Sequence, residues 1–262
     1  MEATEALGLL AAAAPAFGIS ATVQQGNGLR SAVPVLMVDG SARTYDILVS
    51  GSGDRVSARE ATDGRALPAF CPIRHINVDG SFCLNWDAVE SLPVHDASSA
   101  EAWWGVLLQF LRLQKRAGRL RRWPDRREWA HGGAAKHQKK AHDAAAAISP
   151  RLLDDVARAR VTVKKSRANS AEGTAFRLEV SGKPIVRVFV DRGRPATLRQ
   201  ACPCMQDNRP LTLRRCRDHA SRFVELVGAL NDIKQAEARF WRGFKGHQCC
   251  GTMDGCPLAI TP

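Results

Sequence analysis

Short β-branched runs separated by glycine-containing turns fill most of the first sixty residues. The runs lie at residues 19–24, 33–38, 45–49 and 55–60. Such spacing is typical of antiparallel strands joined by tight turns, and Asp39-Gly40 is the strongest hairpin signal among them. The pattern predicts an antiparallel meander, preceded by an Ala/Leu-rich helix over residues 3–14 that Pro15 ends.

A broad apolar stripe at helical spacing follows the meander. Its members are Trp103, Val106, Leu107, Phe110, Leu111 and Leu113. Ser98 or Ser99 is suited to cap this helix, and the stripe predicts that the helix lies across the sheet. Pro124 is expected to begin a further helical stretch, interrupted at Gly132-Gly133 and resumed over residues 134–148.

The segment between the meander and the apolar helix contains Cys71 to Trp86, CPIRHINVDGSFCLNW. Cys83 lies between two apolar residues, with the amide side chain of Asn77 six residues upstream. A semi-exposed thiol with a nearby N–H donor is what thioester chemistry requires. By residue type alone, a cysteine in such an apolar frame is more often a small buried side chain.

The order of these elements resembles that of the ubiquitin-conjugating enzymes, whose signature is His-Pro-Asn followed by Ile-Cys-Leu and a Trp-bearing loop. The matching residues are His75, Asn77, Cys83, Leu84 and Trp86. Ile76 replaces the family proline, and Asn77 is slightly closer to Cys83 than in the eukaryotic enzymes. Both departures suit a divergent bacterial member. The chain is similar to stand-alone conjugating proteins with Cys-rich tails found in bacterial ubiquitin-like and anti-phage (CBASS) operons.

This resemblance implies a role for each matching residue. Cys83 would carry the C-terminal carboxyl of a protein as a thioester, which a lysine amine would convert to an isopeptide bond. Asn77 would donate to the oxyanion or hold the loop that does so, and His75 would brace that loop through a backbone hydrogen bond. Asp96 and Asp125 are the candidates for orienting the amine.

The resemblance also suggests partners. By analogy with the CBASS proteins, the conjugated partner is the C-terminus of a cyclic-oligonucleotide synthase, joined to a lysine-bearing target. The chain has no phosphate-cradling Gly-rich loop followed by Lys-Ser or Lys-Thr, so a separate activating enzyme or another acyl donor must charge Cys83. A Cys/His hydrolase using Cys83 with His95 is a weaker hypothesis, because no clear orienting acid accompanies it.

The second half of the chain has a different pattern of residues from the first. Three alternating or β-branched runs lie at residues 161–165, 175–180 and 185–190. Ser181-Gly182-Lys183-Pro184 reads as a hairpin between the last two. The sequence therefore predicts two α+β domains: residues 1–148, a UBC-like antiparallel meander packed on helices, and residues 149–262, a Cys-rich C-terminal region.

Six of the eight cysteines lie in the last quarter, and in a reducing compartment they favour metal binding over a disulfide framework. The candidate ligands of a structural zinc are Cys202, Cys204, Cys216, Cys249, Cys250 and Cys256, with His219 and His247 nearby. A helical stripe from Phe223 to Ala236 is expected to bring the two cysteine groups together. Unligated thiols are the alternative, because no spacing is a standard C-x2-C knuckle. An acyl relay from Cys249-Cys250 to Cys83 is a further option.

The chain carries 38 Lys and Arg against 26 Asp and Glu, a net charge of +12. An acidic partner is therefore plausible, and the competing function is a zinc-containing, basic nucleic-acid-binding protein. His131, His137 and His142 lack ligand spacing and are expected at the surface. Glu2 and Glu5 stand where a signal peptide would be basic, and no stretch reaches membrane-spanning length, so we expect a cytoplasmic protein.

Overall fold

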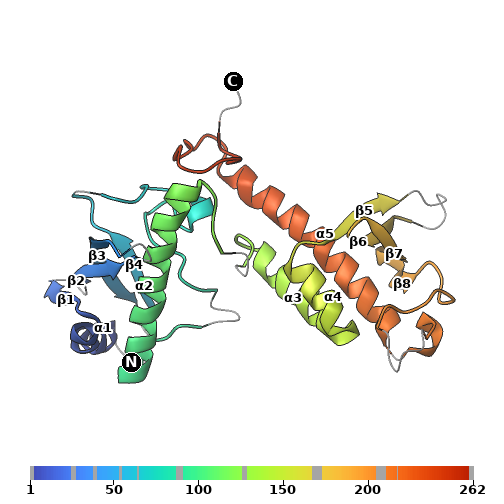
Figure 1. Cartoon of the computed structure of the whole chain (residues 1–262), viewed down its shortest axis with the longest axis horizontal. Coiled ribbons are helices and arrows are strands. Elements are labelled where there is room, and N and C mark those ends of the chain that lie inside the picture. The colour runs from blue at the N-terminus through green and yellow to red at the C-terminus, as the bar shows by residue number, and fades with distance from the viewer. Residues whose placement is uncertain are drawn as a thin grey trace. The chain divides into compact units, whose positions relative to one another are not determined.

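The computed structural model in Figure 1 describes the chain in ten segments. They are residues 3–24, 28–37, 40–52, 55–63, 65–86, 91–125, 129–166, 173–204, 211–216 and 218–259. The chain divides into two compact units, which we call unit 1, residues 1–125 with 246–262, and unit 2, residues 126–245.

Unit 1 is built on an antiparallel four-stranded meander with the strand order β1-β2-β3-β4, which confirms the predicted α+β architecture. Its elements are α1 (Ala3–Ala13), β1 (Ser20–Gln24), β2 (Gly28–Leu36), β3 (Ala42–Ser52), β4 (Arg55–Glu60) and α2 (Ala97–Leu120). Every second residue of β2 is buried, because successive side chains of a strand point to opposite faces. One face of the sheet thus packs against the helices.

The two helices of unit 1 share one core with this sheet. Trp103 and Trp104 of α2 are completely buried and meet edge to face, with ring centroids 5.1 Å apart. The Trp104 Nε1–H donates to the carbonyl of Leu10 in α1 at 2.9 Å. A buried indole needs such a partner, so this bond fixes α2 against α1.

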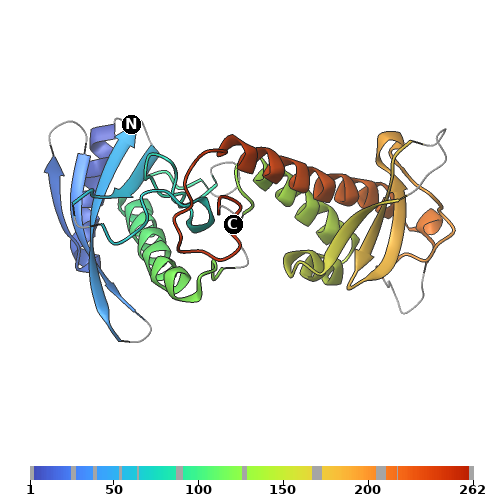
Figure 2. The same cartoon turned by 90° about the horizontal axis from the view of Figure 1, so that it is seen from above.

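Unit 2 packs three helices against a second antiparallel sheet. Its elements are α3 (Ala134–Ile148), α4 (Pro150–Ala157), β5 (Val161–Ser166), β6 (Ala175–Val180), β7 (Lys183–Phe189), β8 (Arg194–Pro195) and α5 (His219–Gly243). The sheet order is β5-β6-β7-β8, and Figure 2 shows α5 running across it. Val163, Leu178 and Val186 face Phe223 and Leu226 of α5 in one buried cluster.

Helix α3 joins unit 2 because its inner face is made of small apolar residues. Ala141, Ala144, Ala145 and Ile148 are buried in the same cluster as the apolar face of α5. The division after residue 125 therefore differs from the one expected after residue 148, since α3 falls in unit 2.

Two local expectations need correction. Residues 124–125 and 129–133 are not helical, and the helix begins only at Ala134; Gly132 takes a positive φ of 54° that interrupts helical geometry. The β6–β7 hairpin has a two-residue turn, because Val180 pairs directly with Lys183 and Ser181 and Gly182 both have positive φ. Asp39 of the other predicted hairpin lies outside the described residues.

Candidate functional site

Cys83 lies on the outgoing arm of a short hairpin that follows β4. Ile76 pairs with Phe82 across this hairpin, and the Phe82 N–H donates to the carbonyl of Ala58 in β4 at 2.8 Å. The Gly80 N–H donates to the Asn77 carbonyl at 2.9 Å, and Gly80 has a φ of 79°. The glycine therefore permits the tight turn that returns the chain to Cys83.

The hairpin separates a buried face from an exposed one. Ile76 and Phe82 are 1% and 6% exposed and belong to the core of unit 1, whereas their neighbours Asn77 and Cys83 are exposed. Because side chains alternate, Asn77 and Cys83 occupy the same outer face at diagonal positions, which in a regular ladder are about 7–8 Å apart. The Cys83 thiol donates to the Asn85 carbonyl at 3.7 Å.

His75 holds Cys83 through its backbone. Its carbonyl accepts the Cys83 N–H at 2.9 Å, and its own N–H donates to the Pro72 carbonyl at 2.9 Å. His75 adopts a left-handed conformation with a φ of 55° and ends the 3₁₀ turn Pro72–Arg74. Its buried ring lies 5.0 Å from the ring of Trp123, so the loop is anchored in the core on that side.

Two residues that the sequence pattern did not single out, Ser81 and Asp79, orient the amide of Asn77. Asn77 Nδ2 donates to Ser81 Oγ at 3.0 Å, and Ser81 Oγ donates to Asp79 Oδ1 at 2.6 Å. Asp79 also accepts the Ser81 N–H at 2.9 Å, and these bonds hold the pKa of its carboxyl below the usual value. The Asp-Gly-Ser sequence after Asn77 is a recognisable Asx-turn signal that could have identified both residues.

Asp96 caps helix α2. Its Oδ1 accepts the Ser99 N–H at 2.7 Å, and Ser99 Oγ accepts the Asp96 N–H at 2.9 Å, which forms a capping box. These bonds hold the pKa of Asp96 below its ordinary value. The expected cap at Ser98 or Ser99 is therefore wrong. The other acidic candidate, Asp125, is exposed at the last described residue before unit 2.

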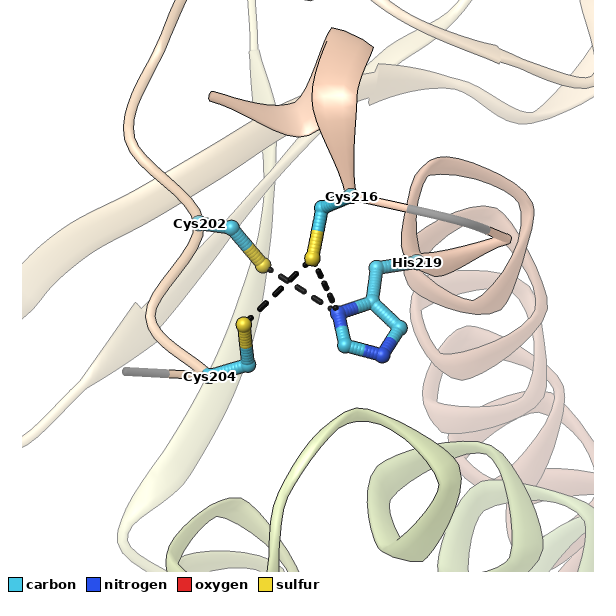
Figure 3. Close-up of side chains that lie close together, drawn as sticks. All are labelled: Cys202, Cys204, Cys216 and His219. Carbon is cyan, nitrogen blue, oxygen red and sulfur yellow. Dashed lines mark hydrogen bonds between the residues drawn. The ribbon is translucent and has the colours of Figure 1, made fainter. Parts of the chain in front are cut away.

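A second cluster, in unit 2, joins three cysteines and one histidine (Figure 3). Cys202 and Cys204 come from the loop after β8, Cys216 follows the 3₁₀ turn Leu213–Arg215, and His219 is the first residue of α5. Only Cys204 is more than marginally exposed. The fold brings the two loops together through a bridge between residues 201 and 212.

The donor atoms of this cluster have the chemistry and spacing of a structural metal site. His219 Nδ1 lies 3.3 Å from Cys202 Sγ and 3.0 Å from Cys216 Sγ, and Cys204 Sγ lies 3.4 Å from Cys216 Sγ. All four atoms lie within 4.8 Å of one another. Tetrahedral zinc with three thiolates and one imidazole separates its ligand atoms by about 3.6–3.8 Å. The cluster could therefore hold a metal ion.

The last three cysteines do not join this cluster. Helix α5 separates His219 from the residue at its other end, Gly243, by about 36 Å at 1.5 Å per residue. Six further residues to Cys249 span at most about 20 Å, so that thiol cannot return to His219. Cys249, Cys250 and Cys256 belong to unit 1. The expectation that the helical stripe gathers both cysteine groups is wrong, because the stripe lies along one straight helix.

Among the described residues, no helix is long and apolar enough to cross a bilayer.

Comparison with known families divides the chain near residue 125, as the structure does, but places residues 246–258 with the second family although they belong to unit 1. Residues 17–125 match the family described as "Prokaryotic E2 domain", and residues 130–258 match the family described as "Cysteine-rich domain, C-terminal to E2 domain". Neither the curated proteins nor the solved structures gave a match. The first match contains Cys83 and Asn77, and the second contains the Cys3His cluster.

Proposed function

Because the chain consists of a prokaryotic E2 domain followed by a C-terminal cysteine-rich domain, we propose that Cys83 is the nucleophile of a ubiquitin-conjugating-like transferase. The observation that carries this proposal is the shared outer face of one hairpin, on which Cys83 and Asn77 are both exposed. An exposed thiol can receive a protein C-terminus, whereas a buried structural cysteine cannot.

The chemistry follows from these positions. The Cys83 thiolate attacks the carbonyl carbon of an activated protein C-terminus, whose leaving group departs, and the sulfur then holds the acyl group as a thioester. The incoming lysine nitrogen attacks the carbonyl carbon of this thioester. The C–S bond breaks, the electron pair returns to sulfur, and the amine loses a proton to solvent. The Asn77 N–H donates to the tetrahedral oxyanion, Ser81 orients that amide, and the His75 carbonyl holds the Cys83 backbone. Asp96 is left out because its carboxylate caps α2.

The proposed partners rest on the relation to bacterial conjugating proteins. The acyl donor is a protein C-terminus, taken by analogy to be that of a cyclic-oligonucleotide synthase in an anti-phage operon, and the acceptor is a lysine. A separate activating enzyme charges Cys83. No proposed step requires a membrane.

The transfer reaction can be tested without knowing the natural donor. The full chain is mixed with a peptide thioester ending in glycine, and the adduct is followed by intact mass and on a non-reducing gel. We expect a thiol-sensitive adduct that discharges to free lysine and is lost in Cys83→Ala. Cys249→Ser is the matched control, because Cys249 is a half-buried cysteine outside the hairpin. An adduct that persists in Cys83→Ala contradicts the assignment.

For the Cys3His cluster we propose a structural zinc ion bound by Cys202, Cys204, Cys216 and His219. When bound, zinc would tie the loop after β8 to the first residue of α5. All four ligands come from the protein, as in closed structural sites, so a catalytic role is not proposed. Metal analysis of the purified chain should give one zinc per molecule, and Cys216→Ser should lower it. A metal-free, fully folded chain would contradict this assignment.

A second candidate function, nucleic-acid binding, is favoured by the charge of unit 2. That unit contains 26 Lys and Arg against 12 Asp and Glu, a net charge of +14, whereas the rest of the chain carries 12 against 14. On its sheet, Lys164 pairs with Arg177, and Arg177 with Arg187, so three cations lie at adjacent positions on three strands; the Glu179 carboxylate neutralises part of their charge through Lys164 and Arg177. The net positive charge of the unit as a whole is what suits a phosphate backbone.

Anisotropy of a labelled oligonucleotide with the full chain tests this second function. We expect binding that weakens steeply with salt, since each neutralised phosphate adds about one unit to the salt slope. Arg214→Ala with Arg215→Ala should reduce the slope, because both side chains are exposed in unit 2. Arg55→Ala with Arg59→Ala in unit 1 is the control pair. Absence of binding at low salt would exclude nucleic acid as the partner.

A further inference from the structure

Two cysteines far apart in the sequence meet in unit 1. The Cys250 thiol lies 2.9 Å from the Cys71 sulfur, although 179 positions separate them. Cys71 is 2% exposed and Cys250 is half-buried. Neither residue belongs to the outer face of the Cys83 hairpin or to the Cys3His cluster, so the transfer mechanism leaves this pair unexplained.

The C-terminal segment, residues 246–259, is docked on unit 1 around this thiol pair. Met253 is buried in one cluster with Cys71 and with Ala117 of α2. The Asp254 N–H donates to the Arg121 carbonyl at 2.7 Å, and the Arg121 side chain returns a 2.6 Å bond to the Asp254 carboxylate. Upstream of Cys250, the His247 ring lies 5.3 Å from the Phe70 ring, so contacts within unit 1 hold the segment on both sides of Cys250.

A buried guanidinium lies beside the pair. Arg74 is 5% exposed, and it donates to the side chain and carbonyl of Gln114 at 2.8 and 2.9 Å and to Thr252 Oγ1 at 3.2 Å. Within the described part of the chain, these hydrogen-bond partners are all neutral. A buried cation favours a nearby anion. Burial lowers the pKa of the Arg74 guanidinium; among the ionisable groups around it, the thiols of Cys71 and Cys250 have the largest electrostatic effect on this pKa, and both raise it.

The two thiols have opposite tendencies to ionise. Burial raises the pKa of Cys250, but hydrogen bonds with Cys71 and Thr252 and the charge of Arg74 outweigh it, so the net shift is downward. Burial and the neighbouring Cys250 raise the pKa of Cys71 well above that of a free thiol. Reactive cysteines typically occupy such partly exposed positions beside a cation, and inert ones are buried.

We propose that Cys250 and Cys71 form a second reactive thiol site, distinct from Cys83, whose substrate is a low-molecular-weight disulfide such as oxidised glutathione. The Cys250 thiolate attacks one sulfur of the small disulfide and releases one small thiol. The Cys71 thiol then attacks the Cys250 sulfur of this mixed disulfide, forms the Cys71–Cys250 bond, and passes its proton to the second small thiolate as that leaves. Two protein thiols and one small disulfide thus become one protein disulfide and two small thiols.

This disulfide would fasten the C-terminal segment to the backbone that supports the Cys83 hairpin. The N–H groups of Cys71 and Ile76 each donate to the other's carbonyl at 3.1 Å, and Ile76 pairs with Phe82 across the hairpin. The oxidised state therefore adds a covalent link between residues 246–259 and the hairpin, where the reduced state has only packing and hydrogen bonds.

Peptide mapping of the full chain tests the site. The Cys83→Ser variant, which lacks the exposed thiol of Cys83, is incubated with oxidised glutathione, alkylated and digested without reduction. We expect a link between the peptides containing Cys71 and Cys250, which is absent in Cys250→Ser and retained in Cys249→Ser, the adjacent-cysteine control. In Cys71→Ser, glutathione should remain attached to Cys250, because the displacing thiol is gone.

Three results would overturn the proposal. The two peptides could remain linked in Cys250→Ser. Alternatively, glutathione could attach to Cys249 as readily as to Cys250. A second zinc ion could also be found on these thiols and lost in Cys250→Ser, which would make the pair part of a metal site. None of these readouts uses acyl transfer, so the result is independent of the function proposed for Cys83.

Discussion

The hydrogen bond between Asn77 and Ser81 separates two contributions to transfer, the presence of the amide donor and its orientation. Asn77→Ala removes the donor, whereas Ser81→Ala keeps the amide and deletes the 3.0 Å bond that directs it, together with the 2.6 Å bond from Ser81 Oγ to Asp79. Asn77 is exposed and Ser81 is half-buried at the surface turn. Both substitutions should therefore leave the free energy of unfolding within about 0.5 kcal/mol of the wild type.

The expected falls in the rate of aminolysis differ between Asn77→Ala and Ser81→Ala by about an order of magnitude or more. Loss of one oxyanion donor typically costs about 2.7–4 kcal/mol, a 10²- to 10³-fold fall in the rate of aminolysis. Loss of a single neutral hydrogen bond costs about 0.5–1.5 kcal/mol, which corresponds to a roughly 2- to 13-fold fall. Ser81→Ala should thus give an intermediate rate, because the amide samples other orientations but still reaches the oxyanion part of the time.

A single-turnover assay measures these rates directly. Each variant is charged at Cys83 by exchange with the glycine-terminated peptide thioester, freed of excess peptide, and mixed with free lysine. The decay of the adduct is followed by intact mass, with loss to water recorded in parallel. We expect the extent of charging at equilibrium to be equal in all variants, because Asn77 and Ser81 change the barrier of acyl transfer and not the stability of the thioester.

Two outcomes would refute this reasoning. If Asn77→Ala discharges to lysine at the wild-type rate, the amide does not stabilise the oxyanion. If Ser81→Ala is as slow as Asn77→Ala, Ser81 contributes more than orientation of the amide. Equal melting temperatures of the three proteins are the control, since a shifted hairpin would lower all activities together.

Further predictions concern unit 2. If zinc is bound as we propose, a chelator should loosen the loop after β8 and the start of α5. Amide exchange there should become faster, while amide exchange in α2 should stay at its rate before chelation. Leu226→Ala should lower the free energy of unfolding by about 2–5 kcal/mol, because Leu226 is completely buried, and chemical denaturation measures it. Glu179 has a lowered pKa through its bonds to Lys164 and then Arg177, so its stabilisation is present above the ordinary value of 4.5 and is lost as the pH falls through its folded pKa. Denaturation midpoints should therefore fall less with acid in Glu179→Gln than in the wild type.

All strands of the first sheet and three of the second could be predicted because their signals are local, whereas the two-residue β8 is too short to give one. Alternation and turn residues suffice for a meander, in which each strand pairs with the next along the chain. The start of α3 was harder to predict, since Pro124 is a favourable first helical residue by itself. The turn at residues 131–133 then breaks the helical geometry. A Cβ atom at residue 132 would lie 3.0 Å from the Phe240 ring, so the ring leaves room only for glycine there, a constraint that no local pattern reveals.

The candidate site was predictable for the same reason. Cys83, Asn77 and the turn between them lie within seven residues, so their common face follows from the alternation of a hairpin. The Cys3His cluster was only partly predictable. His219 and Cys216 are three residues apart in the sequence, but which cysteines join them depends on the direction and length of α5.

The path of the chain after α5 explains why eight cysteines cannot form one metal centre. A straight helix of 25 residues carries the chain away from His219, and the following segment docks on unit 1 through Met253. Among the cysteines beyond the helix, Cys250 therefore meets Cys71 near the cation of Arg74, and its surroundings favour an ionised, reactive thiol. The cysteines before the helix meet an imidazole, which favours metal. Burial and the neighbouring charge, and not the spacing of cysteines in the sequence, decide which chemistry each thiol can perform.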